Sequence, residues 1–298
     1  MHDKRFTGVI PPAITPFDEE GRVDEGALRR LSEFWAGNVD ALFVCGTYGS
    51  GPLMAADERK RVADVVLECV AGRIPVIVHA GAITTEQAVD LARHAERAGA
   101  KAVAAVPPFY YEHPDEAIRA HYKTLVDAVS IPVYAYNNPK TARNAISPQI
   151  LAELAEAGVS GIKDSSFDIL YFYGIMRKVK KRGFEFIMGT EALALPAWLC
   201  GSRACVSGLA NALPEPVSKL MSLCGKGAFE EAGRQQQLVL ALRDVMHLGP
   251  TISVIHAVLE LRGIPSGRPR PPFQPVSDTI KARLKSEFAS LGVDPAGM

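Results

Sequence analysis

The sequence predicts an α/β fold, a (β/α)8 barrel with a C-terminal helical extension. Short apolar segments recur along residues 8–208 at the spacing of a strand followed by a helix. These segments are apolar almost throughout rather than at alternate positions, which is typical of parallel strands covered on both faces. The chain has 298 residues, a length that accommodates a barrel of about 250 residues and a modest extension.

The predicted strands all lie before residue 209. In chain order they are GVIPPAI from Gly8, DALFVCG from Asp40, IPVIVHAG from Ile74, KAVAAVP from Lys101, IPVYAYN from Ile131, VSGIKD from Val159, FEFIMG from Phe184 and SRACVSG from Ser202. The alternative is an open, doubly wound sheet, which usually carries a glycine-rich phosphate loop after its first strand. Residues 11–21, PPAITPFDEEG, contain neither GxGxxG nor GxxxxGKS, so the barrel is preferred.

Amphipathic segments between the strands predict helices. The segment over 57–69 carries apolar residues at i, i+3, i+4 and i+7 and charges on its other face. The segment over 84–98 begins at a capping threonine, Thr84 or Thr85, and stops at a glycine. Ser147, followed by a proline, caps a further helix that ends at Gly158.

The strand–helix rhythm stops after Gly208. Residues 213–246 and 251–261 are predicted to be helical, the proline-rich segment 263–278 to be extended, and a last helix to follow it. The sequence therefore predicts two parts, a barrel over residues 1–209 and a helical extension over 210–298.

Composition excludes several classes of function. The 33 Lys and Arg residues balance the 33 Asp and Glu residues, which argues against nucleic acid or an acidic membrane surface as partner. No apolar run reaches the ~18 residues that span a bilayer, and the first residues lack the apolar core of a secretory signal, so a cytoplasmic location is expected. Five scattered cysteines without a CxxC pair are predicted to be buried thiols in a reducing compartment.

Barrel enzymes carry their chemistry at the C-terminal ends of the strands. The residues at those ends are Gly46, Thr47, Tyr48, Gly49 and Ser50 after the second strand, His79 after the third, Pro107 to Tyr111 after the fourth, Tyr136, Asn137, Asn138 and Pro139 after the fifth, Lys163 and Asp164 after the sixth, Gly189, Thr190 and Glu191 after the seventh, and Ser207 and Gly208 after the eighth. His79, Asp164 and Glu191 have no metal-ligand spacing, so no metal is expected. No motif supports a nicotinamide, flavin or pyridoxal cofactor.

Lys163 is the unusual residue in this set, because it closes an apolar strand and is predicted to point into the barrel mouth. Burial disfavours the ammonium form, and a neutral amine can attack a ketone to form a Schiff base. A structural lysine paired with Asp164 is the alternative. Tyr136 ends the neighbouring strand and could transfer protons, while Thr47 and the amides of its glycine-rich turn could bind a carboxylate or the tyrosine. A core tyrosine and a turn threonine are the structural alternatives.

Four motifs carry a resemblance to a known family. Gly46-Thr47-x-Gly49, Pro108-x-Tyr110, Tyr136-Asn137-x-Pro139 and Gly161-Ile162-Lys163-Asp164, in this order on these strands, resemble the dihydrodipicolinate synthase/N-acetylneuraminate lyase superfamily of class I aldolases. The likeness runs from about Phe6 into the C-terminal helices. It implies that pyruvate, or the pyruvate half of a 2-keto acid, binds covalently to Lys163, with Tyr136 as proton shuttle and Thr47 touching the carboxylate or the tyrosine. It also implies a homo-oligomer, a dimer or tetramer, in which Tyr110, or alternatively Tyr111, enters the neighbouring subunit's site.

Local features of the sequence refine the expected substrate. The segments 49–53, 162–165 and 269–273 look like those of archaeal-type 2-keto-3-deoxygluconate aldolases, which favours a lyase that makes or cleaves pyruvate plus an aldehyde. Tyr48 stands where the family usually has a second Thr or Ser, and aromatic residues there are similar to those of hydratase-aldolases. Thr141 occupies the place of an arginine in dihydrodipicolinate synthase itself, for which Arg143 could substitute.

The resemblance therefore leaves three alternatives to the aldolase. They are a Schiff-base dehydratase or hydratase-aldolase, dihydrodipicolinate synthase itself, and a non-catalytic keto-acid binder. The predicted catalytic residues are Lys163, Tyr136, Thr47 and Tyr110. The predicted substrate-binding residues are Gly46, Tyr48, Gly49, Asn138, Arg143, Gly189 and Ser207.

Overall fold

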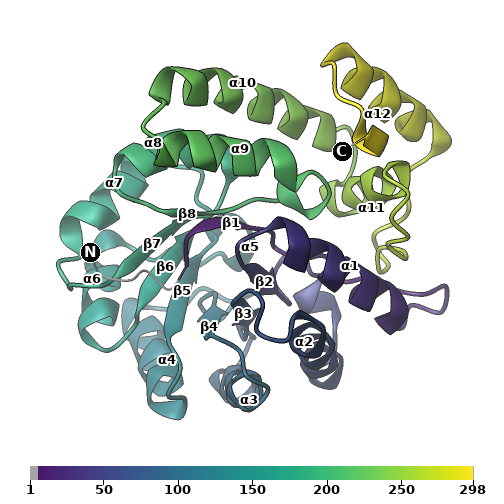
Figure 1. The fold of residues 1–298 in the computed structure, drawn as a ribbon. Helices are drawn as coiled ribbons and strands as arrows, with labels where there is room; N and C mark the ends of the chain where they lie inside the picture. Colours follow the sequence, from purple (N-terminus) through teal and green to yellow (C-terminus); the bar gives the residue numbers. More distant parts are fainter. Residues whose placement is uncertain (1–5, 298) are drawn as a thin grey trace.

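The computed structural model describes residues 6–297 and confirms the predicted (β/α)8 fold, a TIM barrel (Figure 1). Residues 1–5 and 298, which fall within the two predicted parts, lie outside the described residues. The sheet has eight parallel strands in the order β1-β8-β7-β6-β5-β4-β3-β2. The strands are β1 (Gly8–Ile10), β2 (Leu42–Val44), β3 (Val76–His79), β4 (Ala102–Ala105), β5 (Val133–Asn137), β6 (Gly161–Asp164), β7 (Glu185–Met188) and β8 (Ala204–Val206).

Prolines determine how the barrel closes between β1 and β2. Pro11 and Pro12 follow β1 directly and have no N–H to donate, so no regular ladder forms on that side. Single backbone bonds close the gap instead: the Asp40 N–H donates to the Val9 carbonyl at 3.1 Å, and the Phe43 N–H donates to Pro11 at 3.1 Å. The Asp40 carboxylate in turn accepts the Val9 N–H at 2.7 Å. β1 is therefore tied to both of its neighbours.

Helices alternate with the strands around the barrel. They are α1 (Glu25–Asn38), α2 (Ala56–Val70), α3 (Thr85–Arg97), α4 (Asp115–Ala128), α5 (Pro139–Ala142), α6 (Pro148–Glu156), α7 (Ile169–Lys178), α8 (Ala194–Leu199) and α9 (Pro214–Gly225), with 3-10 turns η1 (Gly51–Leu53), η2 (Glu191–Leu193) and η3 (Leu209–Asn211). The predicted caps are present: the Thr84 hydroxyl accepts the Gln87 N–H, and the Ser147 hydroxyl accepts the Ile150 N–H.

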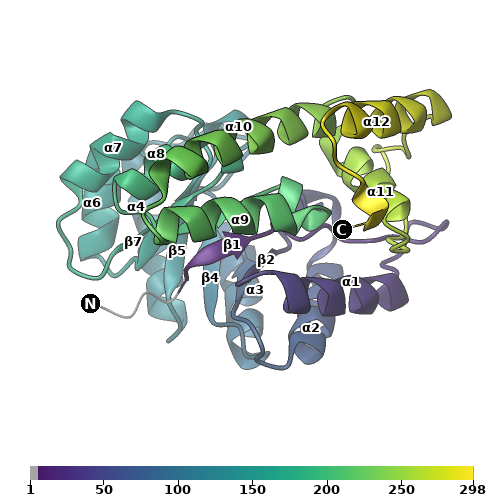
Figure 2. The ribbon, with the colours of Figure 1, turned by 45° about the horizontal axis from the view of Figure 1, so that its top comes forward.

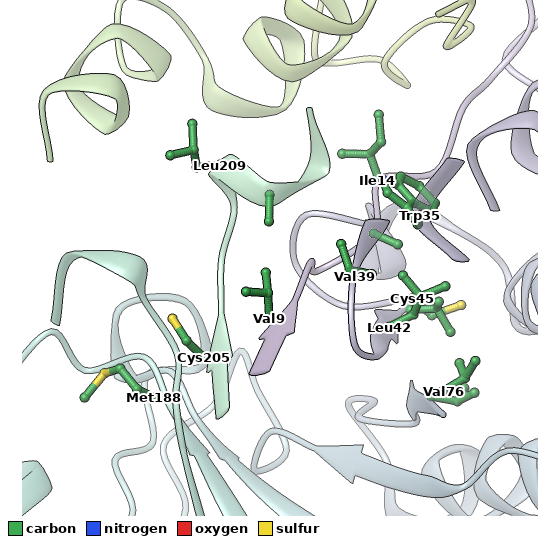
Figure 3. Packing of buried hydrophobic residues seen from close by; sticks show 14 of the residues in the cluster. Val9, Ile14, Trp35, Val39, Leu42, Cys45, Val76, Met188, Cys205 and Leu209 are labelled. Carbon is green, nitrogen blue, oxygen red and sulfur yellow. The ribbon is translucent and has the colours of Figure 1, made fainter. Parts of the chain in front are cut away.

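Two apolar layers hold the barrel together. Phe43, Tyr134 and Tyr136 belong to an inner cluster within the barrel, whereas Val9 and Leu42 belong to an outer cluster between strands and helices. Figure 3 shows part of the outer cluster, around β1, β2 and β8. Because alternate residues of a strand face opposite sides, the side chains that share a face with Tyr136 point into the barrel.

The helices beyond the barrel differ in one respect from the prediction. The stretch 213–246 is interrupted, so α9 ends at Gly225, and three residues separate it from the start of α10 (Phe229–Met246). Gly227 lies in this break with φ +72°, a left-handed conformation that ends helices and suits glycine. The last elements are α11 (Thr251–Leu261), α12 (Asp278–Ser290) and η4 (Pro295–Gly297). Residues 264–277 contain no helix or regular strand, which agrees with the predicted extended segment only in part: residues 271–273 form a turn, and Asp278 is already the first residue of α12.

Helix α9 contacts β1, α8 and α10, and it occupies the position of the eighth barrel helix (Figure 2). The division of the chain at residue 209 stays a prediction. Helix α9, which begins a few residues after that position, packs on β1 of the barrel. Within residues 6–297, no single helix is long and apolar enough to cross a membrane; α10 and α11 pass that test only as a pair, which is bent by 105° at its break.

The cysteine prediction is wrong for two of the five residues. Cys45, Cys205 and Cys224 are buried, but Cys69 is half-buried and Cys200 is exposed. Cys69 lies near the end of α2, where its sulfur accepts from the Arg29 guanidinium at 3.5 Å. Cys200 follows the last turn of α8, beyond the packed face of that helix.

Candidate active site

Lys163 and Tyr136 are neighbours in the sheet. Their Cα atoms are paired in register across β5 and β6, so both side chains point into the barrel. The Lys163 side chain is buried, with Nζ 3.8 Å from the centre of the Phe43 ring and 3.9 Å from that of Tyr136. Lys163 forms no ion pair with a carboxylate among residues 6–297. The alternative of a lysine paired with Asp164 is therefore wrong.

These surroundings lower the pKa of Lys163. Burial is the main cause, because it removes water from the ammonium, and the Tyr136 phenol opposes it only in part. Aromatic faces attract a cation, but they do not replace a carboxylate. The side chain is thus poised to lose its proton, and a neutral amine is the form that adds to a carbonyl.

The Tyr136 hydroxyl lies at the centre of a small polar network. It is 3.4 Å from Thr47 Oγ1 and accepts from Asn138 Nδ2 at 3.1 Å. Burial raises the pKa of this phenol, but the Lys163 charge and hydrogen bonds from Thr47, Ser165 and Lys163 outweigh burial and lower it overall. Two groups with lowered pKa values therefore share one site, an arrangement suited to transferring a proton between them.

His79 lines the same interior as a neutral ring. Burial holds its pKa well below the usual range, and the Arg59 and Lys163 cations act in the same direction. The Val106 N–H donates to Nε2 at 3.3 Å, so Nδ1 carries the proton and donates to the Cys45 carbonyl, also at 3.3 Å. Both ring nitrogens thus have protein partners. In residues 6–297, no group of three or more His, Cys, Asp or Glu side chains is arranged to hold a metal ion.

The turn after β2 brings backbone amides to this network. It is tight: a Cβ on Gly46 would lie 2.6 Å from the Phe43 ring, and one on Gly49 would lie 2.8 Å from the Ala13 carbonyl oxygen. The amides of Thr47 and Tyr48 donate to no acceptor within the described part of the chain. Because the Thr47 side chain reaches Tyr136, this turn lies beside Tyr136 and Lys163, and its two N–H groups can hold an anion.

Asp164 faces the opposite way from Lys163 and joins β5 to β6 on the outer side of the barrel. Its carboxylate accepts from Asn137 Nδ2 at 2.8 Å and from the Ser166 hydroxyl at 2.8 Å. Burial raises the pKa of Asp164 to about 6, and these hydrogen bonds limit the rise. Asp164 is thus a positioning residue for the strands that carry Lys163 and Tyr136.

The Asp164→Asn variant should differ from the wild type in how its stability depends on pH, because the buried carboxyl is removed. The folded carboxyl has a pKa of about 6 against an ordinary value of 3.8, so the native state binds its proton more tightly than the unfolded state does. The stability that this provides is complete below pH 4 and is lost as the pH rises to about 6. Urea unfolding should therefore show that the free energy of unfolding of the variant rises relative to that of the wild type, on the order of 2 kcal/mol, between pH 4 and 7. If the free energy of unfolding changed with pH in the same way for both proteins, this account would be contradicted.

A second group of side chains lies at the ends of β2, β6, β7 and β8. Glu191, just after β7, accepts the Gly208 N–H at 3.1 Å and meets Arg243 Nε at 3.4 Å. The Arg243 guanidinium is 5.6 Å from the ring of Phe167, which follows β6. Tyr48 packs against Gly208, where an added Cβ would come within 2.8 Å of its ring.

Sequence reasoning missed some residues of these two groups. Ser165 is two residues after Lys163 on the same strand face, and this spacing could have identified it. Glu191 is among the predicted strand-end residues, but the sequence assigns it no role in binding or catalysis. Arg243 and Phe167 carried no signal, since helix packing alone brings Arg243 to the barrel mouth.

The remaining predicted residues make no contact with Lys163 within the described part of the chain. Tyr110 and Tyr111 are exposed on the loop after β4, and Tyr110 has a φ of 84°. The exposed Arg143 side chain pairs with Glu112 at 3.1 Å beside them. Ser207 is buried, and its hydroxyl accepts the Ala210 N–H of η3 at 3.2 Å. Gly189 packs directly on the Ser165 hydroxyl, which leaves no room for a side chain.

The barrel fold agrees with comparisons to known proteins. A sequence model of the dihydrodipicolinate synthetase family matches residues 5–290. The chain belongs to this family. A DapA-like lyase of Halobacterium salinarum, itself uncharacterized, is 34% identical over 96% of this chain and 94% of its own length. A 4-hydroxy-tetrahydrodipicolinate synthase of Methanosarcina mazei is 31% identical over 97% of this chain and 99% of its own length.

Solved structures of the dihydrodipicolinate synthetase family agree with the fold. YagE, an Escherichia coli K12 prophage protein of the family solved in complex with pyruvate, superposes with a TM-score of 0.91 at 27% identity, over 97% of this chain and 99% of its own. Membership makes this protein a lyase of the class I aldolase type, whose chemistry proceeds through a Schiff base.

Proposed function

We propose that this protein is a pyruvate-dependent class I aldolase that forms a Schiff base at Lys163 and makes or cleaves a carbon–carbon bond between pyruvate and an aldehyde. One observation carries the proposal: Lys163 is buried over the rings of Phe43 and Tyr136, and no carboxylate among residues 6–297 pairs with it. Such an amine has a lowered pKa, so it loses its proton at a lower pH than a lysine in water does.

The reaction follows from the positions of these groups. The neutral Lys163 amine adds to C2 of pyruvate, and Tyr136 gives its proton to the oxygen that becomes the carbinolamine hydroxyl. Loss of water leaves an iminium, which draws electrons from C3, so that C3 releases a proton and becomes the nucleophilic carbon of an enamine. This carbon bonds to the aldehyde carbon, whose oxygen takes up a proton. Water then hydrolyses the new iminium and frees both the 2-keto acid and the amine; cleavage is the reverse sequence.

The turn after β2 supports binding of the pyruvate carboxylate. The two amides without acceptors, those of Thr47 and Tyr48, provide a pair of N–H donors, and the Thr47 hydroxyl lies between that turn and Tyr136. Fixed donors of this kind stabilise a carboxylate without reorganising. Gly46 and Gly49 allow the turn to come this close, since a side chain on either would collide with its neighbours.

Within the lyase class, a 2-keto-3-deoxy sugar acid is the proposed type of 2-keto acid, on the basis of the segments at 49–53 and 269–273. A Schiff-base dehydratase or hydratase-aldolase is the second candidate, because Tyr48 adds an aromatic ring beside the site. Burial raises the pKa of the Tyr48 phenol above its usual value. A phenol that holds its proton so firmly is a poor acid for expelling a hydroxyl group, which supports the aldolase.

A homo-oligomer is part of the proposal. Tyr110 and Tyr111 stack edge to face with ring centres 5.0 Å apart, and more than three-fifths of each is exposed. Exposed aromatic rings on a loop beside the barrel mouth suit insertion into a second copy of the chain. Arg143, with Glu112, would lie at the same contact.

Trapping with borohydride tests the proposed function. Incubation with pyruvate and borohydride should modify Lys163 alone and add pyruvate less one oxygen atom, because reduction replaces the C=N double bond by a stable amine. Peptide mass spectrometry identifies the lysine. Turnover of substrate with Lys163 unmodified under these conditions would refute the mechanism. The control is a sample that receives neither pyruvate nor borohydride.

A further inference from the structure

Arg243 is a cation at the mouth of the barrel that the proposed chemistry does not use. It lies near the end of α10, yet its contacts are residues at the C-terminal ends of strands: Glu191 after β7 and Phe167 after β6. Its side chain is only 24% exposed. The guanidinium is therefore held at the same end of the barrel as Lys163.

The ion pair with Glu191 leaves most of the guanidinium available. Nε approaches the carboxylate at 3.4 Å, and neither terminal nitrogen forms a hydrogen bond within residues 6–297. By contrast, Arg262 donates hydrogen bonds to the Glu215 carboxylate from both terminal nitrogens, at 3.1 and 2.7 Å. A guanidinium with its terminal fork unpaired can take a carboxylate or phosphate through two parallel hydrogen bonds.

Tyr48 connects this cation to the catalytic pair. Its ring packs against Gly208, whose N–H is bound by Glu191, and its hydroxyl bonds with Thr251 at the start of α11. The charges of Glu191, Arg243 and Tyr136 all act on the Tyr48 phenol. Tyr48 therefore lies close to both Arg243 and Tyr136, and Tyr136 is the neighbour of Lys163.

We propose that Arg243 is a specificity-determining residue that binds an anionic group at the far end of the aldehyde. The substrate would then be a 2-keto acid with a second acidic group, carboxylate or phosphate, remote from its pyruvate half. This inference rests on the proposed aldolase function and narrows its substrate class. Glu191 holds the guanidinium through Nε and leaves the terminal fork to the ligand.

A purely structural role for Arg243 is the competing explanation. Glu191, however, has other ties: its carboxylate accepts the Gly208 N–H, and its backbone carbonyl accepts from Gln236 Nε2 at 2.9 Å. Its position does not depend on Arg243 alone. The two explanations differ in whether losing Arg243 harms charged and neutral substrates equally.

Matched aldehydes test the inference in the wild type and in Arg243→Gln. The pairs are succinic semialdehyde with butanal, and glyceraldehyde 3-phosphate with glyceraldehyde, each condensed with pyruvate. The wild type should prefer the anionic member of at least one pair, and the responding pair identifies carboxylate or phosphate. In Arg243→Gln, kcat/KM for that anionic aldehyde should fall about 10–100-fold, mainly through KM, whereas the value for the neutral partner should stay within about 3-fold.

Three controls make the outcome decisive. Arg234→Gln, on the same helix and paired with Glu230 in solvent, should leave both aldehydes unaffected. Arg243→Lys should restore part of the anion preference, and Glu191→Gln should retain it, since neither removes the positive charge. Equal losses on charged and neutral aldehydes, or a wild type without preference, would overturn the inference. Borohydride trapping of pyruvate at Lys163 in the same samples separates this failure from failure of the aldolase function itself.

Discussion

Lys163→Met should lose at least about 10⁴-fold in kcat/KM, the largest effect of any single substitution in this protein. Methionine fits between the rings of Phe43 and Tyr136 but has no nucleophilic nitrogen, so neither the carbinolamine nor the iminium can form. The loss should appear in kcat and should not be recovered at high pyruvate concentration. Steady-state condensation assays with pyruvate and borohydride trapping measure the two consequences independently.

The same substitution should leave the fold intact, which provides its control. The native state holds the lysine with a lowered pKa, so wild-type stability declines as the pH falls from the ordinary lysine value of 10.5 towards the folded one, where the buried amine gains a proton. Methionine does not carry this cost. Urea unfolding at pH 7 should find Lys163→Met at least as stable as the wild type. A folded variant that still turned over substrate would contradict the assignment of the nucleophile.

The positions of Lys163 and Tyr136 were predictable because their signals in the sequence are local. An apolar strand ending in lysine and another ending in tyrosine are visible in the sequence, and a parallel barrel brings all strand ends to one edge. The register then follows from alternation: Tyr136 and Lys163 are paired and face inward, while Asn137 and Asp164 are paired and face outward. If the register of either strand shifted by one residue, Asn137 or Asp164 would point into the barrel in place of Tyr136 or Lys163.

Contacts made by the helical extension were not predictable in the same way. Arg243 lies 52 positions after Glu191, and no periodicity of α10 distinguishes the turn that reaches the barrel mouth from the others. The break between α9 and α10 depends on the conformation of Gly227, and a glycine near a helix is compatible with either outcome. Tertiary packing decides both features, so they emerged only with the structure.

Tyr136→Phe should lower kcat by about 10²–10⁴-fold and change KM much less. The substitution removes only the hydroxyl, so the ring still packs edge to face on Phe43, with ring centres 5.5 Å apart. Asn138 Nδ2 and Thr47 Oγ1 lose their shared partner, but the turn amides that would bind pyruvate are unchanged.

The variant also separates proton transfer from nucleophilic attack, because Lys163 and its apolar surroundings remain. Borohydride should therefore still trap pyruvate at Lys163 in Tyr136→Phe, but more slowly, since dehydration of the carbinolamine no longer has its proton donor. Tyr134→Phe is the matched control. Tyr134 lies two residues earlier on the same face of β5, and its hydroxyl donates to Glu185 of β7 at 2.7 Å instead of contacting Lys163. A full rate in Tyr136→Phe, or an equal loss in both variants, would show that the proton comes from elsewhere, with the phenol acting only as part of the barrel core.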